Sequence, residues 1–160
     1  MSSEQRVGIG YDVHAFGEGR KLVLGGVEFP GETGLAGHSD ADVVTHAVID
    51  ALLGAAGLGD IGQQFPDSDE RFRDADSLGL LKEALLLVAA GGWKVGNVDL
   101  TVQAERPKIA PVAQQLQARL ADTLGIFHAH VNVKATTGEG LGFIGRGEGI
   151  AAIAVALIER

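Results

Sequence analysis

The chain lacks several features that mark common protein classes. It has no cysteine, which excludes disulfide bonds and thiolate metal ligands. It has no run of about 18 apolar residues, so we expect no transmembrane helix and no membrane partner. Only a few polar residues precede the first predicted strand, too few for a signal or transit peptide, and we expect a cytoplasmic protein. Basic residues number 13 against 21 acidic ones, and the net charge of −8 argues against nucleic-acid binding.

Glycine and apolar residues are what the chain has in quantity. Glycine accounts for 24 of the 160 residues, roughly twice its average usage, which indicates tight turns and close approaches of the backbone to ligands or neighbouring chains. The hydrophobic fraction of 46% is ordinary for a globular protein. The length suits a single domain with a core of its own, and no repeat or linker divides residues 1–160.

The spacing of apolar residues predicts four strands and a hairpin. Residues 7–12 alternate between large and small side chains, and residues 94–104 alternate between apolar and polar ones, which is the period of a strand. Residues 131–136 and 150–158 predict two further strands, the last of them apolar on both faces. Residues 21–29 contain two glycines at their centre and predict a short hairpin.

Three longer helices are expected from a period of 3.6. The first has Ser39 as its expected N-cap, Asp40 and Asp42 in its first turn, and its end near Gly57 or Gly59. The other two are expected from Asp76 to Gly91 and from a turn at residues 105–108 to Gly125. The segment 60–69 between the first two helices is expected to be a functional or mobile loop.

This order of elements predicts an α+β fold in which a mixed β-sheet carries its helices on one face. The other face must also be covered, because the last strand is apolar throughout and few aromatic residues are available to cover it. A homo-oligomer satisfies that need. A somewhat hydrophobic monomer is the alternative.

Two stretches offer the ligands of a metal ion. Asp12 and His14 are two residues apart on a predicted strand, so their side chains share a face. His46 lies on the flank of the first predicted helix, where Asp42 or Asp50 could accept its second ring N–H. One carboxylate and two imidazoles suit Zn²⁺ or a similar ion and leave a coordination position open, as in catalytic sites. The alternative is that Asp12 caps a turn and the histidines are ordinary, partly buried residues.

Weaker patterns lie in the second half of the chain. Residues 134–139 offer hydroxyls, backbone amides and Glu139, which together could bind a phosphate and a hard cation such as Mg²⁺. A strand end with turn residues is the alternative there. Arg146 could bind a diphosphate or pair with Glu148 or another chain. Residues 105–108 could contact a nucleotide or form a solvated turn. His128 and His130 are expected on the surface, with a second zinc site as the alternative.

Several segments together resemble the 2-C-methyl-D-erythritol 2,4-cyclodiphosphate synthases. They are GIGYDVHAF (8–16), GLAGHSDADVVTHAVIDALLGAAGLGDIG (34–62), FPDSD (65–69), NVDLTV (97–102), PK (107–108), VNVKATT (131–137) and LGFIGRGEGIA (141–151). The resemblance implies a single catalytic domain over residues 1–160, in a homotrimer with active sites between subunits. It implies a phosphorus-oxygen lyase that cyclises 4-diphosphocytidyl-2-C-methyl-D-erythritol 2-phosphate and releases CMP in non-mevalonate isoprenoid biosynthesis.

The resemblance also assigns roles to individual residues. Asp12, His14 and His46 match zinc ligands, Glu139 matches the ligand of a second cation, Mg²⁺ or Mn²⁺, at the diphosphate, and His38 with Thr137 would stabilise the transition state. The residues matched to the methylerythritol phosphate are Asp12, His14, His38, Ser39, Asp60, Ile61, Gly62, Phe65, Pro66, Asp67, Ser68 and Asp69. Those matched to the cytidine diphosphate of an adjacent subunit are Ala104, Glu105, Arg106, Pro107, Lys108, Ile109, Ala110, Thr136, Thr137, Gly138 and Glu139.

The resemblance places Phe143, Arg146 and Glu148 at a cavity on the trimer axis that would accept an isoprenoid diphosphate. Two other classes of protein stay open at this stage. A metal-dependent phosphohydrolase would use the same ligands to activate water. A binding protein would keep the oligomer and its axial cavity without turnover.

Overall fold

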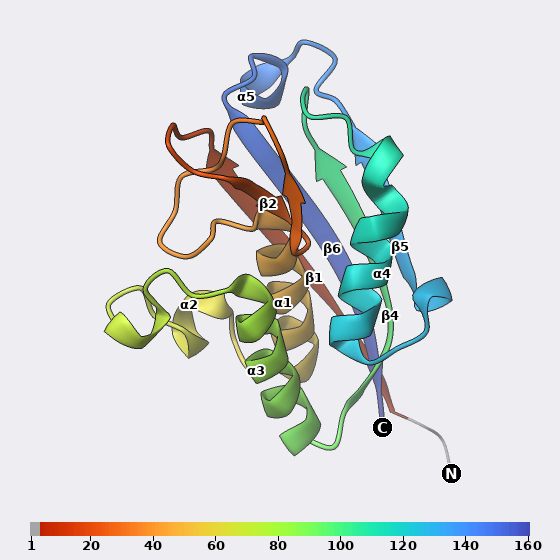
Figure 1. The fold of residues 1–160 in the computed structure, drawn as a ribbon. Helices are drawn as coiled ribbons and strands as arrows, with labels where there is room; N and C mark the ends of the chain where they lie inside the picture. Colours follow the sequence, from red (N-terminus) through yellow and green to blue (C-terminus); the bar gives the residue numbers. More distant parts are fainter. Residues whose placement is uncertain (1–3) are drawn as a thin grey trace.

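A computed structural model describes residues 4–160, and Figure 1 shows its fold. The first three residues of the predicted domain lie outside the described part. The strands are β1 (Gln5–Ala15), β2 (Leu22–Leu24), β3 (Val27–Phe29), β4 (Lys94–Gln103), β5 (Val131–Thr136) and β6 (Gly149–Glu159). The helices are α1 (Val43–Ala56), α2 (Ile61–Gln64), α3 (Ser77–Ala90), α4 (Ala113–Leu124) and α5 (Gly142–Gly145), with 3-10 turns η1 (Glu70–Phe72), η2 (Ala110–Val112) and η3 (His128–His130).

Four strands form one mixed sheet in the order β1-β6-β4-β5, and β2 pairs with β3 in the predicted hairpin. The β1–β6 and β6–β4 pairs are antiparallel, whereas β4 and β5 run parallel. Helix α1 packs on β1 and β6, α4 packs on β5, and α3 packs on α1. All three helices lie on the same side of the sheet (Figure 1). The predicted α+β fold with helices on one face is therefore confirmed.

Helix α1 approaches strand β1 unusually closely. A Cβ atom on Gly8 would lie 2.0 Å from the carbonyl oxygen of Ala51, and one on Gly10 would lie 1.8 Å from that of Ala47. Only glycine fits at such distances, so the small residues on both elements set the separation of helix and strand. The close packing brings the helix side chains next to those of β1, including the residue that follows Gly10 by two, Asp12.

The start of α1 differs from the prediction. The N-cap is Asp42, not Ser39, and no acidic residue lies in the first turn. The fully buried Asp42 carboxylate accepts hydrogen bonds from the Thr45 backbone N–H (3.0 Å) and from the N–H groups of Gly25 and Gly26 (2.8 Å each) in the hairpin turn. The Asp42 carboxylate thus caps the helix and also accepts from two backbone amides of the distant hairpin, which explains why Asp42 is the N-cap. Burial raises the pKa of Asp42, although these hydrogen bonds oppose the shift.

Other helix boundaries follow the sequence more closely. Helix α1 ends at Gly57, which adopts the left-handed conformation expected of a C-cap glycine. Helix α3 has Asp76 as its N-cap and Gly91 as its C-cap. The third long helix begins later than the predicted turn, because η2 containing Pro111 precedes it. The one-turn helices α2 and α5 were not predicted, since four residues are too few to show a helical period.

The face of the sheet opposite the helices divides into an apolar and a polar half. Val7, Ile9 and Tyr11 of β1 are 66%, 69% and 51% exposed there. Ile9 pairs with Val155 of β6 and Tyr11 with Ile153, so these side chains share that face. We call the set Val7, Ile9, Tyr11, Val13, Ile153, Val155 the apolar half.

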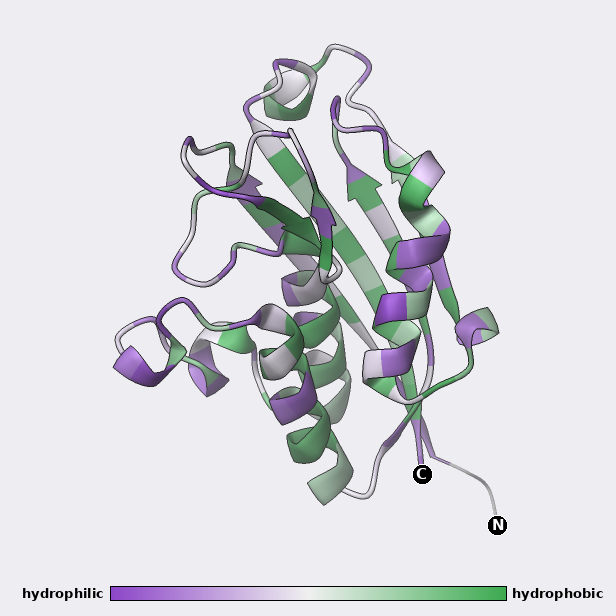
Figure 2. Ribbon diagram, in the orientation of Figure 1, coloured by the Kyte–Doolittle hydropathy of each residue, from purple (hydrophilic) through white to green (hydrophobic). Residues whose placement is uncertain are grey.

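The neighbouring strands continue this face with polar residues. Thr101 of β4 pairs with Lys134 of β5, and Asp99 pairs with Asn132. The Lys134 ammonium donates to the Asp99 carboxylate. On the helix side of the sheet, Figure 2 shows that α1 and β6 are largely hydrophobic, and that α4 carries polar residues on its outward surface. Along residues 4–160, no helix combines the length and apolarity needed to cross a bilayer.

Candidate metal centre

Strand β1 and helix α1 bring Asp12, His14 and His46 together. Asp12 Oδ2 lies 2.9 Å from His14 Nε2 and 3.1 Å from His46 Nδ1. The three ligand atoms are all within 4.8 Å of one another, and no other such group of histidine, aspartate and glutamate exists in residues 4–160. We call these three residues the metal centre. Their separations are those of ligand atoms that can converge on one tetrahedral ion.

The charges of the centre favour an ionised carboxylate. Burial raises the pKa of Asp12, but hydrogen bonds from His14 and His46 outweigh that effect and lower the pKa to about 2. Burial lowers the pKa of His14, whereas the hydrogen bond and charge of Asp12 raise it, and the net shift is upward. A carboxylate that stays ionised at all physiological pH values is the form that binds a cation.

The outer nitrogen of each imidazole is held by a contact beyond the centre. His14 Nδ1 donates to the backbone carbonyl of Ala36 at 2.7 Å, which leaves Nε2 facing the centre. His46 Nε2 lies 2.9 Å from Ser77 Oγ and 3.1 Å from Ser39 Oγ. The Ser77 hydroxyl in turn donates to the carboxylate of Asp40. Such outer contacts fix the tautomer and the orientation of metal-binding histidines.

The predicted partners of His46 were therefore wrong. Asp42 is occupied by the hairpin amides, and Asp50 accepts a hydrogen bond from the Ile61 backbone N–H at 2.7 Å. Both aspartates share a helical spacing with His46, yet their carboxylates are committed to other amides. Ser77 was not predicted, because it lies on α3, 31 residues further along the chain, and nothing in the local spacing connects it to His46.

A cavity of about 240 Å³ opens in front of the metal centre. The predicted site residues that line it, besides the centre, are His38, Ser39, Ile61, Gly62, Phe65 and Asp67. Phe72 and Leu80 also line it, and neither was predicted. Asp60 instead caps α2 by accepting from the Gln63 N–H at 2.9 Å, and Asp69 pairs with Arg71. Neither these two residues nor Pro66 and Ser68 line the cavity.

The second group of predicted residues lies elsewhere in the same chain. Thr137 and Gly138 of this group line a separate cavity of about 190 Å³, together with Phe143, which was assigned to the axial cavity. Glu105 joins the two predicted segments of this group, since its carboxylate accepts from the Gly138 N–H at 2.6 Å. The Glu139 N–H donates to Thr137 Oγ1 at 3.2 Å. His38 and Thr137 therefore do not meet within one chain.

The order of the strands explains this separation. Asp12 pairs with Ala152, Ala152 with Val102, and Val102 with Ala135, so Asp12 and Ala135 lie at one level of the sheet with two strands between them. Three strand spacings are roughly 14 Å. The segment that directly follows Ala135 therefore begins two strands away from the metal centre of its own chain.

Three further predictions concern surface residues. His128 is exposed and lies 2.7 Å from the Asp122 carboxylate, and His130 is exposed against the ring of Phe127. In the part of the chain that the structure describes, neither histidine belongs to a cluster of metal ligands. Arg146 pairs with Glu148 at 2.8 Å, which is one of the alternatives left open for it.

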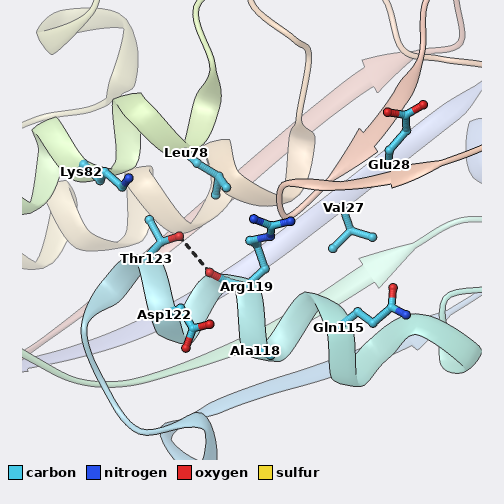
Figure 3. A pocket seen from close by; sticks show the side chains of 9 residues that line it. All are labelled: Val27, Glu28, Leu78, Lys82, Gln115, Ala118, Arg119, Asp122 and Thr123. Carbon is cyan, nitrogen blue, oxygen red and sulfur yellow. Dashed lines mark hydrogen bonds between the residues drawn. The ribbon is translucent and has the colours of Figure 1, made fainter.

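A larger cavity, of about 560 Å³, lies between β3, α3 and α4 (Figure 3). Lys82 and Arg119 line it, together with the carboxylates of Glu28 and Asp122. Those carboxylates are engaged with Lys21 and His128. None of the predicted site residues lines this cavity, so the smaller cavity at the metal centre is the candidate site.

Comparisons with known proteins find close relatives of this chain. A bifunctional IspD/IspF enzyme of Anaeromyxobacter sp. (strain Fw109-5) is 63% identical over 154 residues, which are 96% of this chain and 40% of that enzyme. The chain thus spans less than half of that relative. A 2-C-methyl-D-erythritol 2,4-cyclodiphosphate synthase of Rubrobacter xylanophilus is 62% identical, over 97% of this chain and 95% of that protein.

A comparison with solved structures shows that the fold of this chain is also found in a 2C-methyl-D-erythritol-2,4-cyclodiphosphate synthase. A 2C-methyl-D-erythritol-2,4-cyclodiphosphate synthase in a CDP-bound form superimposes with a TM-score of 0.88 at 39% identity, covering 96% of this chain and 99% of that one. The YgbB family matches residues 5–159, nearly the whole described chain. With this match and the full-length relatives, the chain belongs to the YgbB family.

Proposed function

We propose that this chain cyclises 4-diphosphocytidyl-2-C-methyl-D-erythritol 2-phosphate to 2-C-methyl-D-erythritol 2,4-cyclodiphosphate and releases CMP, as a lyase of non-mevalonate isoprenoid biosynthesis. The observation that carries the proposal is the metal centre at the end of a cavity, in a chain 62% identical to a synthase over almost its full length. We further propose that it works in the cytoplasm.

The residues of the metal centre fit a divalent transition metal, and we assign Zn²⁺ to it. One carboxylate oxygen and two imidazole nitrogens lie within 4.8 Å of one another, and the outer nitrogen of each ring is already hydrogen-bonded. When bound there, such an ion supplies Lewis-acid neutralisation of phosphoryl oxygen charge. Asp12, His14 and His46 would hold the ion at the wall of the cavity that they line.

The reaction forms one phosphorus–oxygen bond and breaks another. An oxygen of the 2-phosphate attacks the phosphorus nearer the methylerythritol, and the bond from that phosphorus to the oxygen of the leaving CMP breaks. The chain offers no cysteine and needs no covalent nucleophile, because the attacking group belongs to the substrate. The cavity has to bring the two ends of one molecule together, which is a gain from proximity.

Residues of the cavity divide this work. His38 is exposed to the cavity beside Ser39 and can donate to a phosphate oxygen. Ile61 and Phe65 supply an apolar wall that suits the carbon skeleton of methylerythritol. Thr137, Lys108 and Glu139 would bind the cytidine diphosphate, with Glu139 holding Mg²⁺ or Mn²⁺ at the diphosphate. The CDP-bound relative supports a cytidine nucleotide as the ligand class.

A homotrimer would complete the site. The apolar half of the sheet is a surface that a second copy of the chain can cover. The separation of roughly 14 Å between Asp12 and Ala135 within one chain also supports a neighbouring chain as the source of Thr137 and Glu139. In the same trimer, Phe143, Arg146 and Glu148 would surround an axial cavity for an isoprenoid diphosphate.

Product analysis tests the proposal. The purified chain is incubated with the substrate and a divalent cation, and the products are separated, identified and quantified by mass spectrometry. A cyclic diphosphate and CMP in equal amounts are expected. A linear phosphate would identify a phosphohydrolase, and binding without turnover would identify a binding protein.

A further inference from the structure

Arg20 has no role in the resemblance or in the cavity, yet it contacts the segment that carries His38. It lies half-buried in the loop between β1 and β2. Its guanidinium donates one hydrogen bond to the carbonyl of Gly37 and another to the carbonyl of Ser39. The two acceptors are the backbone groups on either side of His38. The Arg20 side chain thus binds the backbone carbonyls of the two residues that flank His38 in the sequence.

The rest of this segment is held as well. The carbonyl of Ala36 accepts from His14 at 2.7 Å, and the carbonyl of His38 accepts from the Asp74 N–H at 3.1 Å. A Cβ on Gly37 would lie 3.0 Å from the His14 ring, so the segment also packs directly on the metal centre. Within residues 4–160 the His38 ring itself makes no hydrogen bond, and it remains exposed. The backbone is fixed while the ring stays available to a substrate.

We infer that Arg20 is a positioning residue, which sets His38 against the metal centre for the cyclisation. The inference rests on the proposed function. The planar guanidinium presents several N–H groups in a fixed fork and can reach two carbonyls at once, whereas an ammonium is a point donor. Arg20 acts on the substrate only through the backbone around His38.

The core does not depend on this contact. The apolar residues that follow Arg20 in the chain, Leu22 and Leu24, are fully buried in the core, and the guanidinium makes no hydrogen bond to either of them. The hydrogen bonds of the Arg20 guanidinium go to the backbone of residues 37 and 39, which lie outside the helices and strands. Loss of the guanidinium should therefore change the order of residues 36–40 more than the stability of the whole chain.

Three variants test the inference in the full chain. Arg20→Ala removes the fork, and Arg20→Lys keeps the charge and most of the stem. Lys21→Ala is the matched control, because it removes a neighbouring charge that pairs with Glu28 on the surface. For each we would measure kcat and KM, the metal bound per chain, and hydrogen exchange of the peptide that contains residues 36–40.

For Arg20→Ala we expect kcat to fall about 10- to 100-fold, since a displacement near 1 Å has that effect in active sites. Exchange of residues 36–40 should rise, while the metal content stays at that of the wild type. Arg20→Lys should lose at least about fivefold in kcat, because one ammonium cannot replace a two-donor fork. Added guanidinium ion should restore part of the activity of Arg20→Ala. Lys21→Ala should match the wild type.

Several outcomes would overturn the inference. One is a kcat for Arg20→Ala within twofold of the wild type. Another is full activity of Arg20→Lys, which would leave only the charge as important. A third is unchanged exchange at residues 36–40 in both variants. If Arg20→Ala does not fold, Arg20→Lys decides. If the wild type makes no cyclic product, the proposed function fails, and the exchange experiment still tests whether Arg20 holds the segment.

Discussion

The metal centre and the segment 136–139 differ in whether the residues around them within one chain form a complete site. The centre is assembled from β1 and α1 of the same chain, with its outer contacts to Ala36, Ser39 and Ser77 in place. The segment 136–139 is largely exposed, and its neighbours are residues 104–110 rather than the metal centre. The comparison teaches that one chain supplies all three residues of the metal centre, whereas in the proposed trimer a second chain would contribute residues 136–139.

The largest effect is expected from removing a ligand of the centre. His46→Ala should lose metal binding and activity together, each by more than the 10- to 100-fold typical of outer contacts. Elemental analysis and product formation measure the two. His128→Ala, which removes an exposed histidine far from the centre, is the control and should behave as the wild type. A fully active His46→Ala chain without metal would remove the basis of the proposed mechanism.

A charge on the apolar half should separate metal binding from activity. Ile9→Asp places a carboxylate on a surface that the proposed trimer buries, where an unpaired charge is costly. We expect monomers by light scattering, loss of nearly all activity, and one metal ion still bound per chain. Asp99→Asn, on the polar half of the same face, should change the free energy of unfolding by less than about 1 kcal/mol. Active Ile9→Asp monomers would contradict the two-chain site.

The outer contact of His46 should matter less than the ligand itself. Ser77→Ala removes the acceptor 2.9 Å from His46 Nε2, and we expect metal affinity to fall about 10- to 100-fold. Competition with a chelator measures the affinity. Ser68→Ala is the control, since Ser68 does not line the cavity. Equal affinities for the two variants would show that Ser39 alone orients the ring.

The affinity for metal should also depend on pH. The ring of His14 faces Asp12 and Arg20, and the balance of burial and of the Asp12 contact raises its pKa above 6.5. A metal binds the neutral imidazole, so affinity should fall as the pH drops through that raised pKa, by about tenfold per unit below it. Titrations between pH 8 and pH 5.5 measure this, and a flat profile would contradict it.

His14 and Asp12 both stabilise the metal-free chain, but their contributions to the free energy of unfolding change with pH in opposite directions. The raised pKa of His14 contributes stability that is complete below pH 6.5 and is lost as the pH rises through the raised value. The lowered pKa of Asp12 contributes stability above its usual value of 3.8, which is lost as the pH falls toward about 2. Chemical unfolding at several pH values, without metal, would show both changes.

The smallest expected effect is a partial recovery of activity when two inactive variants are mixed, and it tests directly whether each site takes residues from two chains. His46→Ala chains and Glu139→Ala chains should each be inactive, but a mixture unfolded and refolded together should regain activity. If each site takes its metal centre from one chain and Glu139 from the next, about a quarter of the sites in an equal mixture are intact. No recovery, with trimers formed, would place both groups of residues in one chain.

Much of the metal centre could be predicted from the sequence. A period of two on β1 puts Asp12 and His14 on one face, and the helical stripe puts His46 on the side of α1 near the sheet. Both inferences depend only on the geometry of one element. The outer contacts could not be predicted in this way. Asp42 and Asp50 had the right spacing from His46, and yet amides from the hairpin and from α2 occupy them.

The sequence by itself determined the long strands and helices and the family to which the chain belongs. These depend on local periodicity and on motifs that are continuous in the chain. Only the tertiary structure decided that Ser77 and Asp40 support His46, that Arg20 holds the carbonyls around His38, and that the apolar half lies exposed beside a polar one. Such contacts join segments far apart in sequence, and their partners are selected by how closely the helices pack on the sheet.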